Sequence, residues 1–441
     1  MPEQVAGWPR TAEGLGKWEH SGQVAITGMG ISPIDRRWDG VSMDKTYGAY
    51  AVLSLQRAIE DSGLKSTDID GLMVCPDAAG DSWAAEDRGT PRPYFDAPYD
   101  SEDGLTIVTS GWLIKRMEEA GTPLSGLKWI DDEPSSIGQL TGKASQAVGE
   151  GKARHVLMLY GMGNVEGRYH LEEGRYSRGG RVWSAPWGWM TSAMMQHAFV
   201  FLQYCTKYGG SHDNLAPFVV NQRRNGLMTP WGYYAQHEQY QLTIEDYLTQ
   251  RYIAWPNGLL DSDRPVNHVA SFLFSKADVA KDMKQKPLYV LGHVQAAHPS
   301  KSTMATLEDH EQWTDSLARR LYEAAGASGP DDLDVFNPYD GFATFTQTYL
   351  EAFGWHGVKR GEAFDFYAGD IRVEGPHPFN SSGGNLGNGR TRTAMYTDIV
   401  QQLRGDAGPR QIQIRHETGA CGQVTPGGNG HIFIGTMQSL S

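Results

Sequence analysis

A short segment in the last third of the chain carries side chains that are suited to proton transfer. In residues 337–342 (NPYDGF), Tyr339 offers a phenol hydroxyl and Asp340 a neighbouring carboxylate. A tyrosine has a pKa near 10, so it acts as a base at neutral pH only when hydrogen bonds or positive charge lower that pKa. We expect Tyr339 to exchange protons with an alcohol or alkoxide, with Asp340 as an orienting neighbour. The alternative is a buried tyrosine that is hydrogen-bonded at a turn.

A glycine-rich segment, residues 380–390 (NSSGGNLGNGR), follows about forty positions later. Glycine lets backbone N–H groups approach a ligand oxygen closely, which is the geometry of an oxyanion hole. The amides around Gly383 and Gly384, and around Gly428 in a second glycine loop at 425–430, are the candidates. A Gly-Gly pair by itself more often marks an ordinary turn.

Other residues are candidates by type alone. A second proton-transferring tyrosine is expected from the region before residue 255, where the sequence does not choose among Tyr233, Tyr234, Tyr240 and Tyr247. His298 follows a predicted strand on a loop, although a lone histidine is more often an ordinary core or surface residue. Arginines that could contact the phosphates of a ligand are Arg223, Arg224 and Arg390.

The cysteines argue against a metal site within this chain. Cys75, Cys205 and Cys421 are far apart, and no Cys-x-x-Cys pair exists. A cysteine-rich zinc site is therefore not expected, and three free thiols suit a reducing compartment. We expect no metal and no bound cofactor in this chain.

Composition limits the remaining classes. The 441 residues are 39% hydrophobic and 21% charged, with a formal net charge of −13. This charge does not favour binding to nucleic acid, which requires clustered lysine and arginine. Neither a secretory signal nor a run of about 20 apolar residues is apparent. The expectation is a cytoplasmic protein that binds neither nucleic acid nor membrane.

The pattern of apolar residues predicts layered α/β architecture with a mainly parallel sheet. The strands and helices that we expect are strands at 24–30, 72–74, 129–130, 155–161, 270–274, 288–292, 333–336, 411–415 and 431–434, and helices at 44–61, 135–149, 244–255, 313–326, 345–353 and 393–404. Residues 164–241 are aromatic, dotted with glycine and irregular, which predicts a large cap over the core. Two strand-helix-strand halves should meet near residues 275–290.

Four segments in the same order and spacing resemble the thiolase superfamily. They are the opening strand VAITGMG with the later DIDGLMV, residues 131–161, the NPYDGF segment, and the loop at 380–390. The resemblance implies a duplicated five-layer αβαβα core with a large cap insertion. It divides the chain into an N-terminal half at 1–280, including a cap at about 162–255, and a C-terminal half at 281–441.

The positions that are catalytic in thiolases differ in this chain. The position of the nucleophilic cysteine falls on Pro134, with Ser135 beside it, and that of the second cysteine falls on Val424. Tyr339 and Arg390 stand where thiolases have histidines. These replacements are unsuited to a covalent acyl-enzyme, although Cys421 or Ser135 could still serve an acyltransferase.

The missing cysteine, the Tyr-Asp-Gly-Phe motif and QLRGDAG at 402–408 resemble the lipid-transfer-type branch whose members act as steroid side-chain aldolases. The resemblance implies steroid degradation, as of cholesterol or bile acids, by retro-aldol cleavage of a β-hydroxyacyl-CoA. A 17-hydroxy steroid acyl-CoA would give a 17-keto steroid and a short acyl-CoA such as propionyl-CoA, with CoA entering only as part of the substrate.

The same resemblance implies partners. Family members form a homodimer, and each protomer binds a small zinc-ribbon/OB-fold protein that carries the zinc, which gives a heterotetramer. This chain departs from many relatives at residues 267–269, which read Asn-His-Val in place of Asp-Gly-Ala. A noncatalytic carrier of acyl-CoA or sterol is the alternative, because a retained fold does not guarantee a retained activity.

Overall fold

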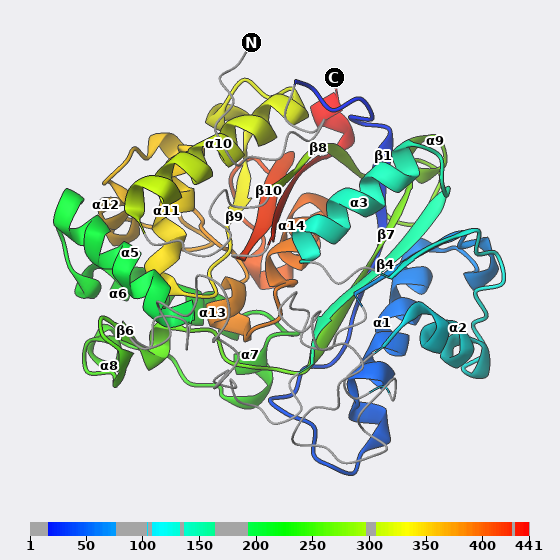
Figure 1. Ribbon diagram of the computed structural model, residues 1–441, viewed down its shortest axis with the longest axis horizontal. Coiled ribbons are helices and arrows are strands. Elements are labelled where there is room, and N and C mark those ends of the chain that lie inside the picture. The colour runs from blue at the N-terminus through cyan, green and yellow to red at the C-terminus, as the bar shows by residue number, and fades with distance from the viewer. Residues whose placement is uncertain are drawn as a thin grey trace, which may run out of the picture.

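A computed structural model describes residues 16–75, 104, 108–132, 136–163, 193–296, 306–425 and 428–440. Nine strands form one hydrogen-bonded sheet that consists of two related halves (Figure 1). The N-terminal half runs β3 (Trp129–Asp132), β2 (Gly71–Val74), β4 (His155–Met162), β7 (His268–Lys276) and β1 (Val24–Ile31). In this half β7 is antiparallel to both neighbours, while β2 is parallel to β3 and β4.

The C-terminal half repeats this arrangement. It runs β8 (Leu288–Ala296), β11 (Gly428–Gly435), β10 (Thr418–Thr425) and β9 (Val335–Asn337). Here β11 is antiparallel to both neighbours, and β9 is parallel to β10. The halves join at β1 and β8 through the pairs Ala25–Tyr289 and Ile26–Leu288. The shared order and strand directions show that the core is duplicated.

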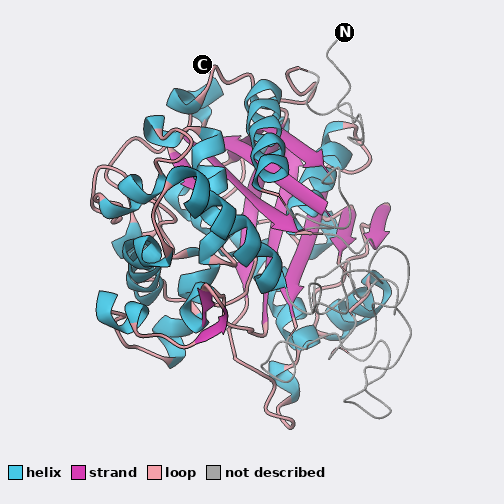
Figure 2. Cartoon of the chain, turned by 60° about the vertical axis from the view of Figure 1, so that its left-hand side comes forward, coloured by secondary structure: helices cyan, strands magenta, loops and turns pink. Residues whose placement is uncertain are grey.

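Helices complete five layers. Helices α1 (Tyr47–Ser62) and α2 (Ser110–Glu119) cover the N-terminal half-sheet, and α10 (Leu307–Ala325) with α11 (Ala343–Phe353) lies on the far side of the C-terminal half. Between the half-sheets lie α3 (Ile137–Gly149) and α14 (Ala394–Arg404) (Figure 1). Figure 2 shows the helices surrounding the sheet. The predicted αβαβα fold class is confirmed. The expectation of a mainly parallel sheet is wrong, because most neighbouring strands of the sheet pair antiparallel.

Glycine allows the central helix to approach the second half-sheet. A Cβ on Gly138 of α3 would overlap the backbone carbonyl of Gly430 in β11. The helix begins with a capping box, in which the side chain of Ser136 accepts from the N–H of Gln139 and the side chain of Gln139 accepts from the N–H of Ser136. Small side chains therefore place the start of α3 directly against the β10–β11 hairpin.

The cap is more helical than expected. Its described part contains α5 (Ala193–Tyr208), α6 (Ala216–Leu227), α7 (Tyr233–His237) and α8 (Ile244–Leu248), followed by a separate hairpin of β5 (Tyr252–Ala254) and β6 (Asn257–Gly258). The remaining short helices are α9 (Ala277–Ala280), α12 (Ala363–Ala368) and α13 (Gly384–Asn388). The prediction of irregular structure is wrong for residues 193–241. Helix α6 was not predicted because part of its buried face is polar, so its sequence lacks apolar residues at helical spacing.

Three other predictions of secondary structure are wrong. The helix expected at 244–255 ends at Leu248, and Tyr252 begins the β5–β6 hairpin. No strand forms at 411–415, because the N–H of Ile412 donates to the side chain of Gln402 at 3.0 Å. Strand β10 was missed, since its small residues carry no alternating pattern.

The division at residue 280 lies between α9 and β8 and stays a prediction, as do the bounds of the cap. Among the described helices, none is long and apolar enough to cross a membrane.

Candidate active site

Four segments that are distant in sequence meet where β9 ends and α11 begins. They are α6, residues 261–266, the turn at 337–342 and the loop at 380–392. The N–H of Asp263 donates to the carbonyl of Gly341 at 3.1 Å, and the N–H of Arg390 donates to the carbonyl of Arg264 at 2.7 Å. Ser262 and Phe342 form an isolated antiparallel bridge. The segment at 261–266 therefore lies between the tyrosine turn and the end of the glycine-rich loop.

Asp340 holds these segments together. Its buried carboxylate accepts the backbone N–H of Asn385 at 2.7 Å and the side-chain amide of Gln222 at 2.8 Å. A Cβ on Gly384 would overlap the carboxylate, so only glycine fits there. Burial raises the pKa of Asp340 to about 7, although these hydrogen bonds oppose the rise. These bonds join the tyrosine turn to α6 and to the glycine-rich loop, whereas the role of Asp340 as an orienting neighbour of Tyr339 stays a prediction.

The glycine-rich loop is fixed by unusual backbone angles. Asn380 and Arg392 have φ of 46° and 56°, values that non-glycine residues seldom adopt outside constrained sites. Its N–H groups bond within the loop, from Gly383 to the carbonyl of Asn380 at 2.7 Å and from Gly384 to the hydroxyl of Ser382 at 3.3 Å. The role of Gly383 and Gly384 in an oxyanion hole stays a prediction, and these internal bonds compete with it.

Tyr339 is buried among charged groups. Its ring lies against Gly341, where a Cβ would overlap the hydroxyl. Burial raises its pKa well above the ordinary value, the charge of Asp263 raises it further, and those of Arg392 and Arg390 lower it. Among the described residues, no hydrogen bond engages the hydroxyl. At neutral pH Tyr339 is therefore a protonated phenol, which makes it a proton donor first.

Sequence reasoning missed three neighbours of Tyr339. Asp263 is buried, and Arg392 is buried with its guanidinium 3.3 Å from the hydroxyl of Tyr160 on β4. Tyr349 on α11 is fully buried, and the charge of Tyr339 contributes to raising its pKa. Asp263 lies in the segment SDRPV at 262–266, and Arg392 lies two residues after the predicted glycine-rich segment, so both were within reach of motif reasoning.

The cap tyrosines lie in two separate groups. Arg223 is buried, with its guanidinium carbon 3.4 Å from the ring centroid of Tyr234 and 4.8 Å from that of Tyr240, whose side chain is largely exposed. These contacts place Arg223 between two rings. The hydroxyl of Tyr247 instead donates to the carboxylate of Asp261 at 2.5 Å. The structure thus does not gather the expected cap tyrosines at one place.

The remaining residues that the sequence suggested for the site either have a defined position or lie outside the described residues. Cys421 is buried in β10 opposite Asn337, and burial raises its pKa well above the ordinary thiol value, with the charge of Asp398 adding to the rise. A thiolate is therefore disfavoured there. Gly428 opens β11 in the hairpin with β10. Pro134, Ser135 and His298 lie outside the described residues.

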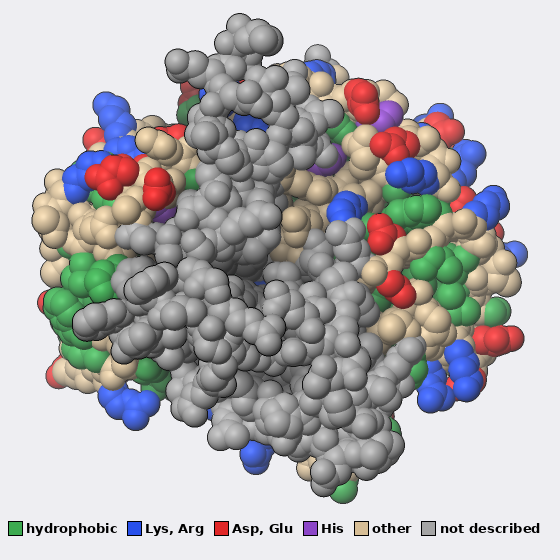
Figure 3. Space-filling model, in the orientation of Figure 1, with side chains coloured by type: hydrophobic (Ala, Val, Ile, Leu, Met, Phe, Trp, Pro, Cys, Tyr) green, Lys and Arg blue, Asp and Glu red, His purple; other side chains and the backbone are tan. Residues whose placement is uncertain are grey.

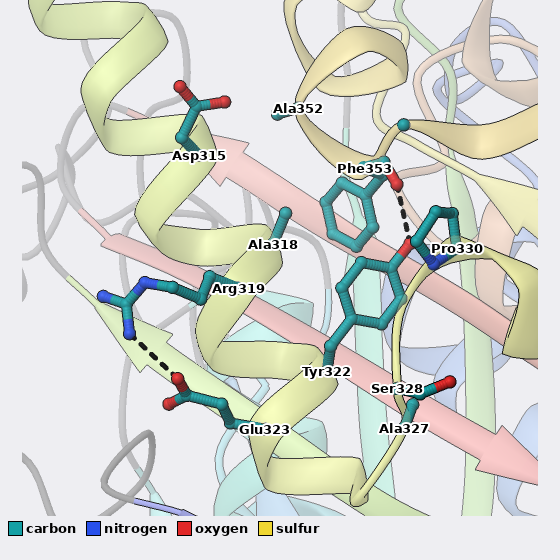
Figure 4. A pocket seen from close by; sticks show the side chains of 11 residues that line it. Asp315, Ala318, Arg319, Tyr322, Glu323, Ala327, Ser328, Pro330, Ala352 and Phe353 are labelled. Carbon is teal, nitrogen blue, oxygen red and sulfur yellow. Dashed lines mark hydrogen bonds and ion pairs between the residues drawn. The ribbon is translucent and has the colours of Figure 1, made fainter. Parts of the chain in front are cut away.

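Other features of the surface lie apart from this site. No group of three or more His, Cys, Asp and Glu side chains within the described segments is placed to hold a metal ion. A pocket of about 390 Å³ opens between α10 and the C-terminal end of α11 (Figure 4). Its polar groups already pair, Arg319 with Glu323 at 3.0 Å and the hydroxyl of Tyr322 with the carbonyl of Phe353 at 2.8 Å. On the face in Figure 3, the described basic and acidic side chains are interspersed.

Comparisons with known proteins agree with this architecture. The family model described as thiolase C-terminal domain-like matches residues 294–428. The 17-hydroxy-3-oxo-4-pregnene-20-carboxyl-CoA lyase of Mycobacterium tuberculosis is 28% identical over 416 residues, which cover 92% of this chain and 98% of that protein. The steroid side-chain-cleaving aldolase of Thermomonospora curvata is 25% identical and covers 83% of this chain and 86% of its own length.

A solved structure described as "Ltp2-ChsH2(DUF35) aldolase" superposes with a TM-score of 0.74 at 20% identity, covering 96% of this chain and 100% of that chain. The human mitochondrial 3-ketoacyl-CoA thiolase in complex with CoA gives a TM-score of 0.62 at 11% identity, over 94% and 98% of the two chains. The chain therefore has the thiolase fold and resembles the thiolase-fold subunit of steroid side-chain-cleaving aldolases.

Proposed function

We propose that this chain is a carbon–carbon lyase that cleaves a β-hydroxyacyl-CoA thioester on a steroid side chain by a retro-aldol reaction. One observation carries the proposal. A protonated, buried phenol at Tyr339 lies among Asp263, Arg390 and Arg392, whereas the thiol of Cys421 is buried with a raised pKa. This arrangement suits proton transfer and does not suit a covalent acyl-enzyme.

The reaction requires neither water nor a redox partner. A base removes the proton of the β-hydroxyl, the oxygen becomes a ketone, and the electrons of the cleaved bond move into the thioester enolate. An acid then protonates the α-carbon, so a 17-hydroxy steroid acyl-CoA gives a 17-keto steroid and a short acyl-CoA such as propionyl-CoA. Tyr339 suits the acid because its phenol keeps its proton at neutral pH and the enolate carbon is far more basic than a phenolate, and the nearby carboxylate of Asp263 suits the removal of the hydroxyl proton.

The positive charges beside Tyr339 suit an anionic intermediate. Arg390 and Arg392 both act on Tyr339 electrostatically, and Arg392 is held in place by its N–H bond to the side chain of Asn385 at 2.8 Å. Preorganised cations in a buried site stabilise the enolate more than water would. The expected contact of Arg390 with the CoA phosphates does not fit this role, because Arg390 acts on Tyr339 and the pantetheine arm separates the phosphates from the thioester. Arg223 on the cap is therefore the remaining candidate for the CoA phosphates.

Assembly is part of the proposal. Strand β3 forms the outer edge of the described sheet and alternates half-buried with exposed residues, and Ile130 is 46% exposed. Its sequence carries two apolar residues and two aspartates, and the outer edge of the strand has no partner strand among the described residues, so it is free to pair with a second copy, which supports a homodimer. The name of the Ltp2-ChsH2(DUF35) aldolase includes a second component. We propose that a small zinc-ribbon/OB-fold protein, which carries the zinc, binds each protomer to form a heterotetramer.

The decisive variant is Tyr339→Phe, which keeps the ring and removes the hydroxyl. Assayed with a 17-hydroxy steroid acyl-CoA and the partner protein, it should lose about 10²- to 10⁴-fold in kcat while still binding the substrate. Tyr289→Phe is the matched control, since Tyr289 is also buried but lies at the start of β8, at the opposite end of the sheet from Tyr339.

Cleavage by Tyr339→Phe at the wild-type rate would refute the role of the phenol. An acyl adduct on Cys421 in mass spectrometry would instead identify an acyltransferase. Tight binding of substrate by the wild-type chain with no turnover, even with the partner present, would identify a carrier.

A further inference from the structure

A buried cluster of three side chains lies in the cap, next to the candidate active site. Nε2 of His212 lies 2.7 Å from Oδ2 of Asp261 and 2.8 Å from the hydroxyl of Tyr247, which donates to Oδ1 of Asp261 at 2.5 Å. The rings of His212 and Tyr247 stack with centroids 4.9 Å apart. All three residues are at least 94% buried. Such a network is rigid because every bond to the carboxylate is shielded from water.

The cluster joins three parts of the cap. His212 precedes α6, Tyr247 belongs to α8, and Asp261 follows the β5–β6 hairpin. Asp261 also accepts the backbone N–H of Gly258 at 2.6 Å. The carboxylate of Asp261 thus receives donors from the segment before α6, from α8 and from the β5–β6 hairpin, and these contacts fix its position.

From Asp261 the chain continues directly into the active site. The next residue, Ser262, bridges Phe342, and Asp263 donates its N–H to Gly341 at 3.1 Å. The carbonyl of Arg264 then accepts the N–H of Arg390 at 2.7 Å. A displacement of Asp261 would therefore move both the Asp263 carboxylate and the backbone of Arg390 relative to Tyr339.

We propose that His212, Tyr247 and Asp261 are positioning residues of the reaction, which hold the segment at 261–264 in register with the tyrosine turn. This role rests on the proposed lyase function and adds three residues that do not touch substrate. Tyr247 enters here through its hydrogen bonds to Asp261 and His212 rather than as the second proton-transferring tyrosine.

The physical consequence concerns the charge around Tyr339. The groups that act on it are Asp263, Asp340, Arg390 and Arg392, with Tyr349 close by. Because the charge of Asp263 raises the pKa of Tyr339, retreat of this carboxylate should lower that pKa. Misplacement of reacting groups by about 1 Å costs up to about 10²-fold in rate.

The test uses the full chain with its partner and four variants. Tyr247→Phe removes one donor to Asp261, His212→Leu removes another, and His212→Gln retains a side-chain N–H. Tyr252→Phe is the control, since the Tyr252 ring contacts His212 at 5.5 Å edge-on and its hydroxyl is not needed for that contact. Turnover is measured as kcat and KM, and 3-fluorotyrosine placed at position 339 is titrated by fluorine NMR.

The expected result is a loss of about 10- to 100-fold in kcat for Tyr247→Phe and His212→Leu, with KM within about twofold of wild type. The fluorine resonance at position 339 should titrate at a lower pH than in the wild type, because the charge of Asp263 raises the pKa of Tyr339. His212→Gln should recover most of the activity, and Tyr252→Phe should match wild type in both measurements.

Two results would overturn the proposal. One is a wild-type kcat and an unchanged fluorine titration in Tyr247→Phe. The other is an equal loss in His212→Gln and His212→Leu together with an equal fall in melting temperature, which would show a structural role only. If the wild-type chain does not cleave the substrate, the lyase function fails, yet the fluorine titration still decides whether the cluster positions Tyr339.

Discussion

The protonation of Asp340 should make the stability of this protein depend on pH in an unusual direction. Its buried carboxyl has a pKa of about 7 in the folded chain, against an ordinary value of 3.8. Because the folded pKa is the higher one, the folded state holds the proton more tightly. The stabilisation is therefore complete below about pH 4 and is lost as the pH rises through about 7.

The magnitude follows from the distance between the pH and the pKa. At pH 5 the carboxyl lies about two pH units below its folded pKa, and each unit corresponds to about 1.4 kcal/mol, so protonation contributes about 3 kcal/mol. At pH 8 this contribution has vanished. Asp340→Asn carries a neutral amide of the same shape at every pH, so it should lack the dependence.

The assay is urea unfolding of both proteins at pH 5 and pH 8. The wild-type free energy of unfolding should fall by about 3 kcal/mol more than that of Asp340→Asn between these conditions, because other titrating groups are common to both. The exposed carboxyl of Asp278 provides the control variant Asp278→Asn, which should behave as wild type. Parallel behaviour of wild type and Asp340→Asn would show that Asp340 ionises normally, and the account of its burial would be wrong.

Three further predictions concern packing and burial. Gly384→Ala should lower stability by about 2–3 kcal/mol in thermal unfolding, since its Cβ overlaps the Asp340 carboxylate and its φ is 56°. The control Gly405→Ala, with φ of 82° but open space around the Cβ, should lower stability by only about 1 kcal/mol. An equal loss of stability in both variants would contradict the steric explanation. Asp398→Ala leaves the buried guanidinium of Arg410 unpaired and should cost about 3–5 kcal/mol in urea unfolding, whereas Asp370→Ala breaks an exposed pair with Arg372 and should cost less than about 1 kcal/mol. Cys421 should resist iodoacetamide in the native protein and react after unfolding; rapid native labelling detected by mass spectrometry would contradict its burial and raised pKa.

Sequence reasoning worked best where local periodicity and burial coincide. Strand β1, helix α1 and strand β4 all lie where they were expected. Each buries a regular apolar stripe or run, which is the property that periodicity measures. The contact between the NPYDGF turn and the glycine-rich loop, which includes the bond from the N–H of Asn385 to Asp340, was not predicted.

The features that the sequence did not predict depend on buried polar side chains, which interrupt the apolar pattern. Helix α6 buries Asn221, Gln222 and Asn225, and its amides bond to the tyrosine turn and the glycine-rich loop, so its buried face reads as polar. Likewise Tyr247 looked equivalent to the other cap tyrosines until its hydrogen bond to Asp261 separated it from them. The pattern of apolar residues in a sequence does not indicate which group a buried polar side chain will hydrogen-bond.

The sequence by itself indicated two strand-helix-strand halves, because these follow from contacts between neighbours along the chain, and its resemblance to the thiolase superfamily pointed to the missing cysteine and to Tyr339 by residue identity. Only the tertiary structure decided the charges that Tyr339 experiences. Asp263 and Arg392 reach it from different segments, and their effect on its pKa depends on distance and burial. Electrostatic energy varies with separation in space, which the spacing of residues along a chain does not specify.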